Sequence, residues 1–97
     1  MRREDFIFTI GYDADTAIID GKAKKKYGKL DTAQLAEAGL LKAAFCSALF
    51  TGDETEFALV LDAYNKGHGT AYTTADELKR LFGVYEVRKD IEKTRSL

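Results

Sequence analysis

Five lysines and a tyrosine lie within the eight residues 22–29, KAKKKYGK. Lysine side chains can neutralise phosphates, and a tyrosine ring can stack on a base. The segment therefore raises the hypothesis of a site for nucleic acid or another polyanion, formed by Lys22, Lys24, Lys25, Lys26, Tyr27 and Lys29. The alternative is a solvated edge strand, because lysines on an open edge discourage pairing with another sheet. We favour the edge strand, since the segment holds no arginine.

A second pattern, FTIGYDADTAII, places two carboxylates directly after a predicted strand. Its Asp-x-Asp-x-Thr motif resembles the nucleophile motif of haloacid-dehalogenase-like phosphohydrolases. The resemblance implies that Asp13 attacks phosphorus, that Asp15 handles protons and that Mg²⁺ lies between them. That family also needs a lysine and another acidic pair on later strands of a parallel sheet, and no strand–helix alternation here would carry them. Acidic residues are also good turn formers, so we predict a turn and no enzyme.

Two single residues, a histidine and a cysteine, could take part in chemistry only with a partner side chain. His68 stands between two glycines, and one histidine without a second histidine or a spaced cysteine is not a metal site. We predict that it belongs to a loop after a helix. Cys46 lies in an apolar segment with no activating base in the sequence nearby, which predicts an inert core thiol. No metal and no cofactor are expected.

The composition sets broad limits on the class of protein. Ninety-seven residues with 45% hydrophobic content predict one globular domain over residues 1–97. A formal net charge of −1 argues against a protein that coats duplex DNA, although a local anion site remains compatible with it. A single cysteine fits a reducing compartment. No apolar run approaches the ~20 residues of a membrane span, so we expect a soluble, cytoplasmic protein without membrane contact.

The other predicted elements pack around one central stretch, residues 31–51, DTAQLAEAGLLKAAFCSALFT. Asp31 and Gln34 form a capping box that predicts the start of a helix. The apolar side chains point in every direction around this helix, and such helices are usually buried. Gly39 is unfavourable in mid-helix, which indicates either a close backbone approach or a break into two helices.

The remaining segments are shorter and have clear boundaries. Residues 6–12 and 16–19 predict two antiparallel strands, and Asp20-Gly21 predicts a hairpin turn to a third strand over 22–27, which we hold open against a turn of helix. Residues 54–66, ended by Gly67, and 75–82 predict two amphipathic helices with capping boxes at Asp53/Glu56 and Thr74/Glu77. Residues 84–87 suggest a short strand, and residues 88–97 a charged, frayed helical tail.

The sequence thus predicts an α+β domain: an N-terminal antiparallel hairpin or meander, then three helices, of which the first is central. We expect a non-enzymatic interaction or adaptor protein that forms a homodimer, because the central helix carries more apolar surface than the other segments can cover. The residues expected at the dimer contact are Leu35, Gly39, Leu40, Phe45, Leu49 and Phe57. The alternatives are the polyanion module and, less favoured, the phosphohydrolase-like site.

Overall fold

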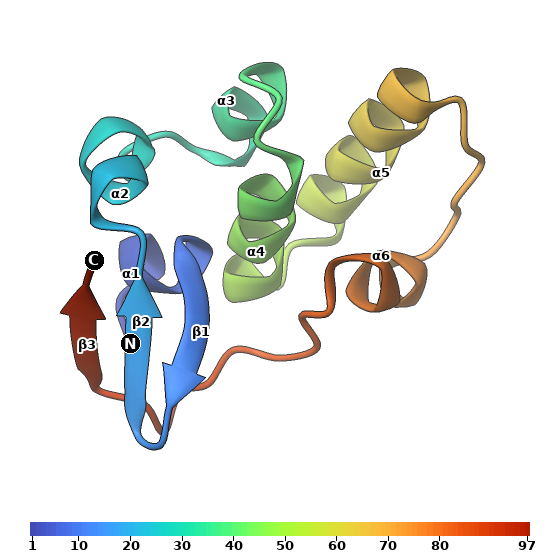
Figure 1. Cartoon of the computed structure of the whole chain (residues 1–97). Coiled ribbons are helices and arrows are strands. Elements are labelled where there is room, and N and C mark those ends of the chain that lie inside the picture. The colour runs from blue at the N-terminus through green and yellow to red at the C-terminus, as the bar shows by residue number, and fades with distance from the viewer.

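The computed structural model describes all residues from 1 to 97, and it has an α+β fold with a small sheet and six helices. The sheet and the two short helices beside it form one end of the molecule, and the four other helices extend away from them (Figure 1). The elements in chain order are α1 (Arg3–Ile7), β1 (Thr9–Asp13), β2 (Thr16–Ile19), α2 (Gly21–Tyr27), α3 (Thr32–Glu37), α4 (Leu41–Thr51), α5 (Glu54–His68), α6 (Ala75–Phe82) and β3 (Lys93–Ser96).

The sheet has the strand order β1-β2-β3. β1 and β2 are antiparallel and joined by a tight turn in which Ala14 has a φ of 53°. A bulge at Ile10 shifts the register between Thr9 and Gly11. β3 pairs with β2 in parallel, with Lys93 opposite Thr16. The third strand therefore comes from the far end of the chain.

Several predictions about this end of the molecule are wrong. The predicted first strand starts too early, because residues 3–7 form α1. For residues 22–27 the structure selects the helical alternative over the third strand of a meander. The Asp20 side chain accepts the Ala23 N–H at 3.1 Å and caps α2 instead of turning a hairpin. No strand forms at residues 84–87, and the predicted helical tail contains β3.

The predicted helix over 31–51 is broken at Gly39 into α3 and α4, and together with the unexpected α1 and α2 this gives six helices instead of three. Asp31 and Gln34 form the predicted capping box at the start of α3. Gly39 then adopts a φ of +79°, and the Leu40 N–H donates to the Leu35 carbonyl at 3.0 Å. The Gly39 N–H donates to the Ala36 carbonyl, which completes a Schellman motif. Glycine favours this conformation, and it ends α3.

The two later helices match the sequence better. α6 has both its predicted bounds and its capping box between Thr74 and Glu77. α5 starts as predicted but continues past Gly67 to His68 and ends at Gly69. Asp53 caps α5 through the Thr55 N–H at 2.8 Å, without the predicted reciprocal bond from Glu56. None of the six helices has the length and apolar character that crossing a bilayer requires.

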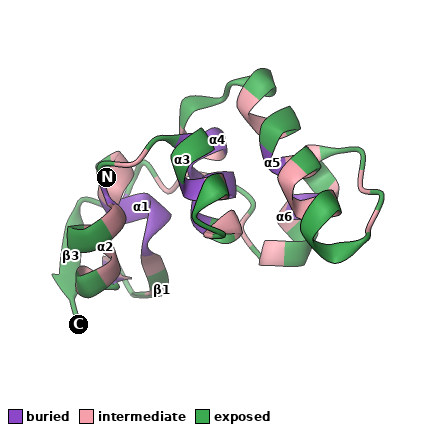
Figure 2. Cartoon of the chain, turned by 90° about the horizontal axis from the view of Figure 1, so that it is seen from above, coloured by how far each residue is buried: buried purple, intermediate pink, exposed green.

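α4 is the centre of the core. It packs against α1, α3 and α5, and all six residues from 43 to 48 are buried (Figure 2). The Phe45 side chain has no exposed surface, and its ring lies 5.8 Å from that of Phe57 and 5.5 Å from that of Phe82. The prediction that this stretch is buried is confirmed for residues 43–48 of α4, and the chain itself covers them.

Candidate interaction groove

An elongated groove lies between β1 and α4. It consists of two hollows, of about 390 and 440 Å³. Residues 9–12 of β1 form one wall, residues 39–43 with Cys46 form the other, and residues 83–88 line one end. Thr9, Ile10 and Lys42 line both hollows, so the two hollows adjoin. We call it the β1–α4 groove.

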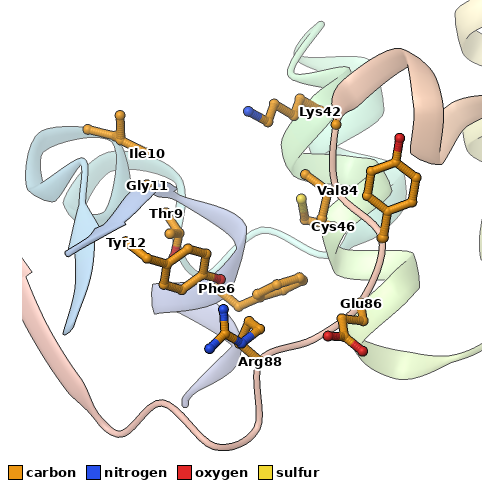
Figure 3. Close-up of a pocket in the computed structure, with 12 residues that line it drawn as sticks. Phe6, Thr9, Ile10, Gly11, Tyr12, Lys42, Cys46, Val84, Glu86 and Arg88 are labelled. Atoms are coloured by element: carbon orange, nitrogen blue, oxygen red, sulfur yellow. The ribbon is translucent and has the colours of Figure 1, made fainter. Parts of the chain in front are cut away.

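Exposed apolar side chains gather at this groove. Ile10 is 59% exposed, Tyr12 40% and Tyr85 59%, and these are three of the six exposed large apolar side chains in the molecule. In Figure 3, Ile10 and Tyr12 extend from β1 on one side, while Cys46 and Val84 lie on the other. Contiguous apolar surface on a small protein marks contact sites more often than scattered single residues do.

The charged side chains of the groove differ in their partners. Arg88 lies over the Tyr12 ring, 5.2 Å from its centroid, and binds Asp90 through two hydrogen bonds of 3.1 Å. Burial raises the pKa of Tyr12, and Arg88 partly opposes that increase. Lys42 has no acidic side chain within 4.0 Å. Lys42 is therefore the cation of the groove that is free to pair with a ligand.

Cys46 lies at the floor of the groove and is 3% exposed. Burial raises the pKa of its thiol to about 11, although the charge of Lys42 acts in the opposite direction. The thiol is therefore protonated at neutral pH. This state fits the prediction of an inert core cysteine, because the thiolate is the reactive form.

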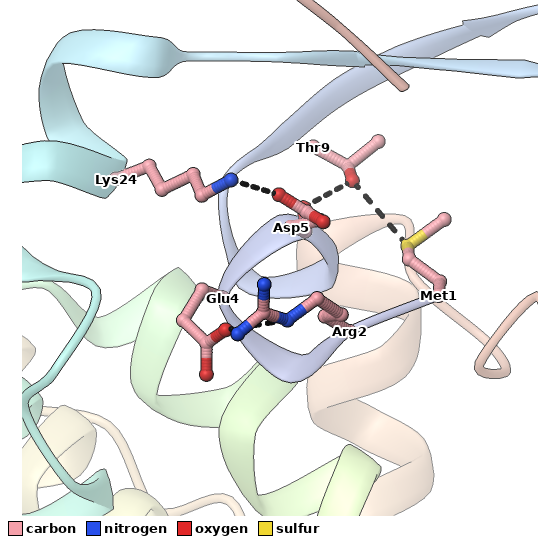
Figure 4. A network of polar contacts seen from close by, with 6 residues as sticks. All are labelled: Met1, Arg2, Glu4, Asp5, Thr9 and Lys24. Atoms are coloured by element: carbon pink, nitrogen blue, oxygen red, sulfur yellow. Dashed lines mark hydrogen bonds and ion pairs between the residues drawn. The ribbon is translucent and has the colours of Figure 1, made fainter. Parts of the chain in front are cut away.

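The lysine-rich segment forms the exposed face of α2. Lys22, Lys25, Lys26 and Lys29 are exposed at helical spacings of three, four and seven residues, and none of the four has an ion-pair partner. Lys24 instead points inward to the buried Asp5, at 2.6 Å (Figure 4). Tyr27 is half-buried, and Lys26 lies over its ring at 5.2 Å. One face of that ring is therefore occupied and not free to stack on a base.

The structure brings one lysine to the pair Asp13 and Asp15 but not the second acidic pair that the resemblance requires. Both aspartates are exposed at the β1–β2 turn, and Asp15 pairs with Lys93 at 3.1 Å. No group of three or more carboxylate, histidine or cysteine side chains that could hold a metal ion is present. His68 lies in the last turn of α5 and not in the predicted loop. Its ring stacks on the Tyr64 ring, with the two centroids 4.1 Å apart.

The apolar residues predicted to form a dimer contact belong to the core or pack against it. Leu35 and Phe45 have no exposed surface, so neither can touch a partner in this structure. Three others are partly buried against the core: Leu40, Leu49 and Phe57. Gly39 has no atom within 4 Å of the position that a Cβ would occupy. Its role within the chain is the Schellman turn, for which no second backbone is needed.

Sequence reasoning missed the groove. The sequence pattern places Ile10 and Tyr12 only in a strand, Tyr85 in a short strand and Arg88 in a tail. Their proximity depends on how residues 83–92 cross from α6 to β3 past β1, as Figure 1 shows.

Comparison of the chain with protein-family models, with curated proteins and with solved structures finds no match.

Proposed function

We propose that the chain is a non-enzymatic interaction domain that binds a protein partner through the β1–α4 groove. The supporting observation is that Ile10, Tyr12 and Tyr85 expose their apolar surface around the β1–α4 groove. A pocket with apolar walls and a few polar groups is the usual form of a binding site. These three side chains leave apolar surface in contact with solvent, so a partner that covers them would gain the free energy of apolar burial.

The test compares two pairs of substitutions in the full-length protein. Ile10→Asp with Tyr85→Asp places charges in the groove, while Leu59→Asp with Leu81→Asp places the same charges at exposed apolar positions outside it. Each protein is used to capture partners from a lysate of its own source. We expect a partner that binds the wild type and the control pair but not the groove pair. Equal capture by all three proteins, or by none, would contradict the proposal.

Self-association remains a prediction of the sequence, and we retain it as one form of this proposal. The surface available for it is smaller than expected, because the chain itself covers Leu35 and Phe45. A second copy would have to use half-buried residues such as Leu40, Leu49 and Phe57 or the groove itself. Sedimentation equilibrium at ~100 μM measures this directly, and a monomeric mass would exclude a stable homodimer at that concentration.

One observation favours polyanion binding as a second candidate function. Lys22, Lys25, Lys26 and Lys29 share one exposed face without acidic partners. The alternative reading as an edge strand is wrong, because these residues lie on and directly after a helix. A surface of this kind would bind single-stranded nucleic acid with a strong dependence on salt.

This candidate is tested with a labelled single-stranded oligonucleotide. Four contacts predict a slope of about −3 for the logarithm of affinity against the logarithm of salt concentration. Substituting the four lysines by glutamine should abolish binding. A control with glutamine at Lys66, Lys79, Lys89 and Lys93 has the same net charge and should bind normally. Equal losses in both variants, or no measurable binding by the wild type, would contradict a site on α2.

A further inference from the structure

We infer that the β1–α4 groove binds an extended peptide segment, which pairs with the open edge of β1 and carries an acidic side chain opposite Lys42. This inference rests on the proposed function and specifies the kind of partner. Three observations support it: an unpaired strand edge, the elongated shape of the groove, and the distribution of charge along it.

The first observation is the open edge of β1. β1 has one neighbour in the sheet, β2, so its other edge has no strand partner. Residues 9–12 of this strand line the groove, and in Figure 1 the strand lies between β2 and α4. In an antiparallel pair, alternate residues direct their N–H and C=O groups away from the neighbouring strand. Another extended backbone is the ligand that satisfies such groups in a row.

The second observation is shape. The two hollows follow one another along β1 and share Thr9, Ile10 and Lys42. A strand of five residues spans about 17 Å, and a peptide of similar length would lie in both hollows at once. A compact small molecule would fill one hollow and leave the other empty. The elongated form therefore favours an extended chain.

The third observation is charge. Lys42 lines both hollows and has no ion-pair partner. The acidic side chains of the groove each line one hollow only, Asp20 at one end and Glu86 at the other. Arg88 lines the same hollow as Glu86 but is paired with Asp90, so Lys42 is the unpaired cation in the middle of the groove. An acidic residue in the middle of the peptide complements this arrangement, with apolar residues two positions away on the same face.

The experiment uses a phage-displayed library of random heptapeptides selected on the full-length protein. The strongest peptide is then synthesised with blocked ends and titrated. We expect a central Asp or Glu between apolar residues. N-methylation at one set of alternate positions should abolish binding, while N-methylation at the other set should have little effect, because only one set faces β1. Lys42→Glu should weaken binding at least about tenfold, and a peptide with lysine in place of its acidic residue should recover it.

Several results would overturn the inference. They are the absence of any selected peptide, equal tolerance of N-methylation at both sets of positions, or an affinity that Lys42→Glu does not change. A dimer that Tyr85→Asp dissociates would assign the groove to a second copy instead. The proposed function fails separately: if the groove variants retain every captured partner, the groove is not an interaction surface. If they lose a partner while peptides show no backbone dependence, only the strand-pairing inference fails.

Discussion

The buried hydroxyl groups of Ser47 and Thr32 lie 2.7 Å apart and join two charged residues that do not touch. The Arg3 guanidinium donates to Ser47 Oγ through Nε at 3.2 Å and Nη2 at 2.9 Å. At the other end, Thr32 donates to the Glu56 carboxylate. Arginine only donates and a carboxylate only accepts, so the single proton of Thr32 goes to Glu56 and that of Ser47 goes to Thr32. The resulting chain of hydrogen bonds links α1, α4, α3 and α5.

This chain of hydrogen bonds should contribute to stability as a unit. Ser47→Ala removes the partner of Arg3 Nε and the donor to the buried Thr32 hydroxyl, while Arg3 Nη2 keeps the Leu30 carbonyl at 2.6 Å. We expect a loss of about 1–3 kcal/mol in the free energy of unfolding. Thr32→Val should cost a similar amount. The double variant should cost less than the sum, with a coupling of roughly 0.5–3 kcal/mol. Urea unfolding measures each value, with the exposed Ser96→Ala as a control. Strict additivity would show that the two hydroxyls act independently.

Lys24 should differ from its neighbours in the lysine-rich segment. It is the only polar partner of the buried Asp5 Oδ1. Lys24→Gln leaves that carboxylate without a cation, and we expect a loss of about 1–3 kcal/mol in unfolding free energy. Lys25→Gln removes an exposed, unpaired charge and should change stability by less than about 0.5 kcal/mol. Equal effects in thermal or urea unfolding would mean that the Asp5–Lys24 pair contributes nothing.

Gly39 and Gly67 should respond in opposite ways to replacement by alanine. Neither has an atom near the position of the added Cβ, so only the backbone conformation differs. Gly39 has a φ of +79°, and alanine there should cost roughly 1–2 kcal/mol. Gly67 lies inside α5, where alanine should add about 0.4–1 kcal/mol. Urea unfolding of the two variants checks both signs, and destabilisation by both would contradict the assignment of these conformations.

The sequence predicted the features that depend on local signals. The capping boxes at Asp31 and Thr74 form as expected, and the bounds of α6 are correct. The apolar content of residues 43–48 also identified the buried element correctly. At Gly39 the sequence left two alternatives, and the structure selects the break into two helices.

The errors have a common physical cause, which is that the deciding contacts are distant in sequence. Residues 93–96 are all exposed and polar, yet they form β3 because the free edge of β2 is available to them. Asp20-Gly21 fits both a hairpin turn and a helix start, and α2 forms after the cap. The β1–α4 groove combines three separate segments, so no single stretch of sequence carries a signal for it.

The buried thiol of Cys46 should make the free energy of unfolding depend on pH. Its pKa is raised to about 11 in the folded protein from an ordinary value of 9.0. A raised pKa contributes stability below pH 9, and that contribution is lost as pH rises towards 11, at about 1.4 kcal/mol per pH unit. The difference in unfolding free energy between the wild type and Cys46→Ala should therefore shrink over this range. A difference that is constant from pH 8 to pH 11 would contradict a buried, protonated thiol.

The most direct test of the β1–α4 groove as an interaction surface is site-specific photo-crosslinking in cells of the natural source. A photoreactive phenylalanine analogue replaces Tyr85 at the groove in one protein and Leu81 outside it in another, and both positions are exposed. We predict that position 85 yields a specific crosslinked protein and that position 81 does not. Crosslinking of the same partner at position 81 and none at position 85 would contradict the assignment of the groove.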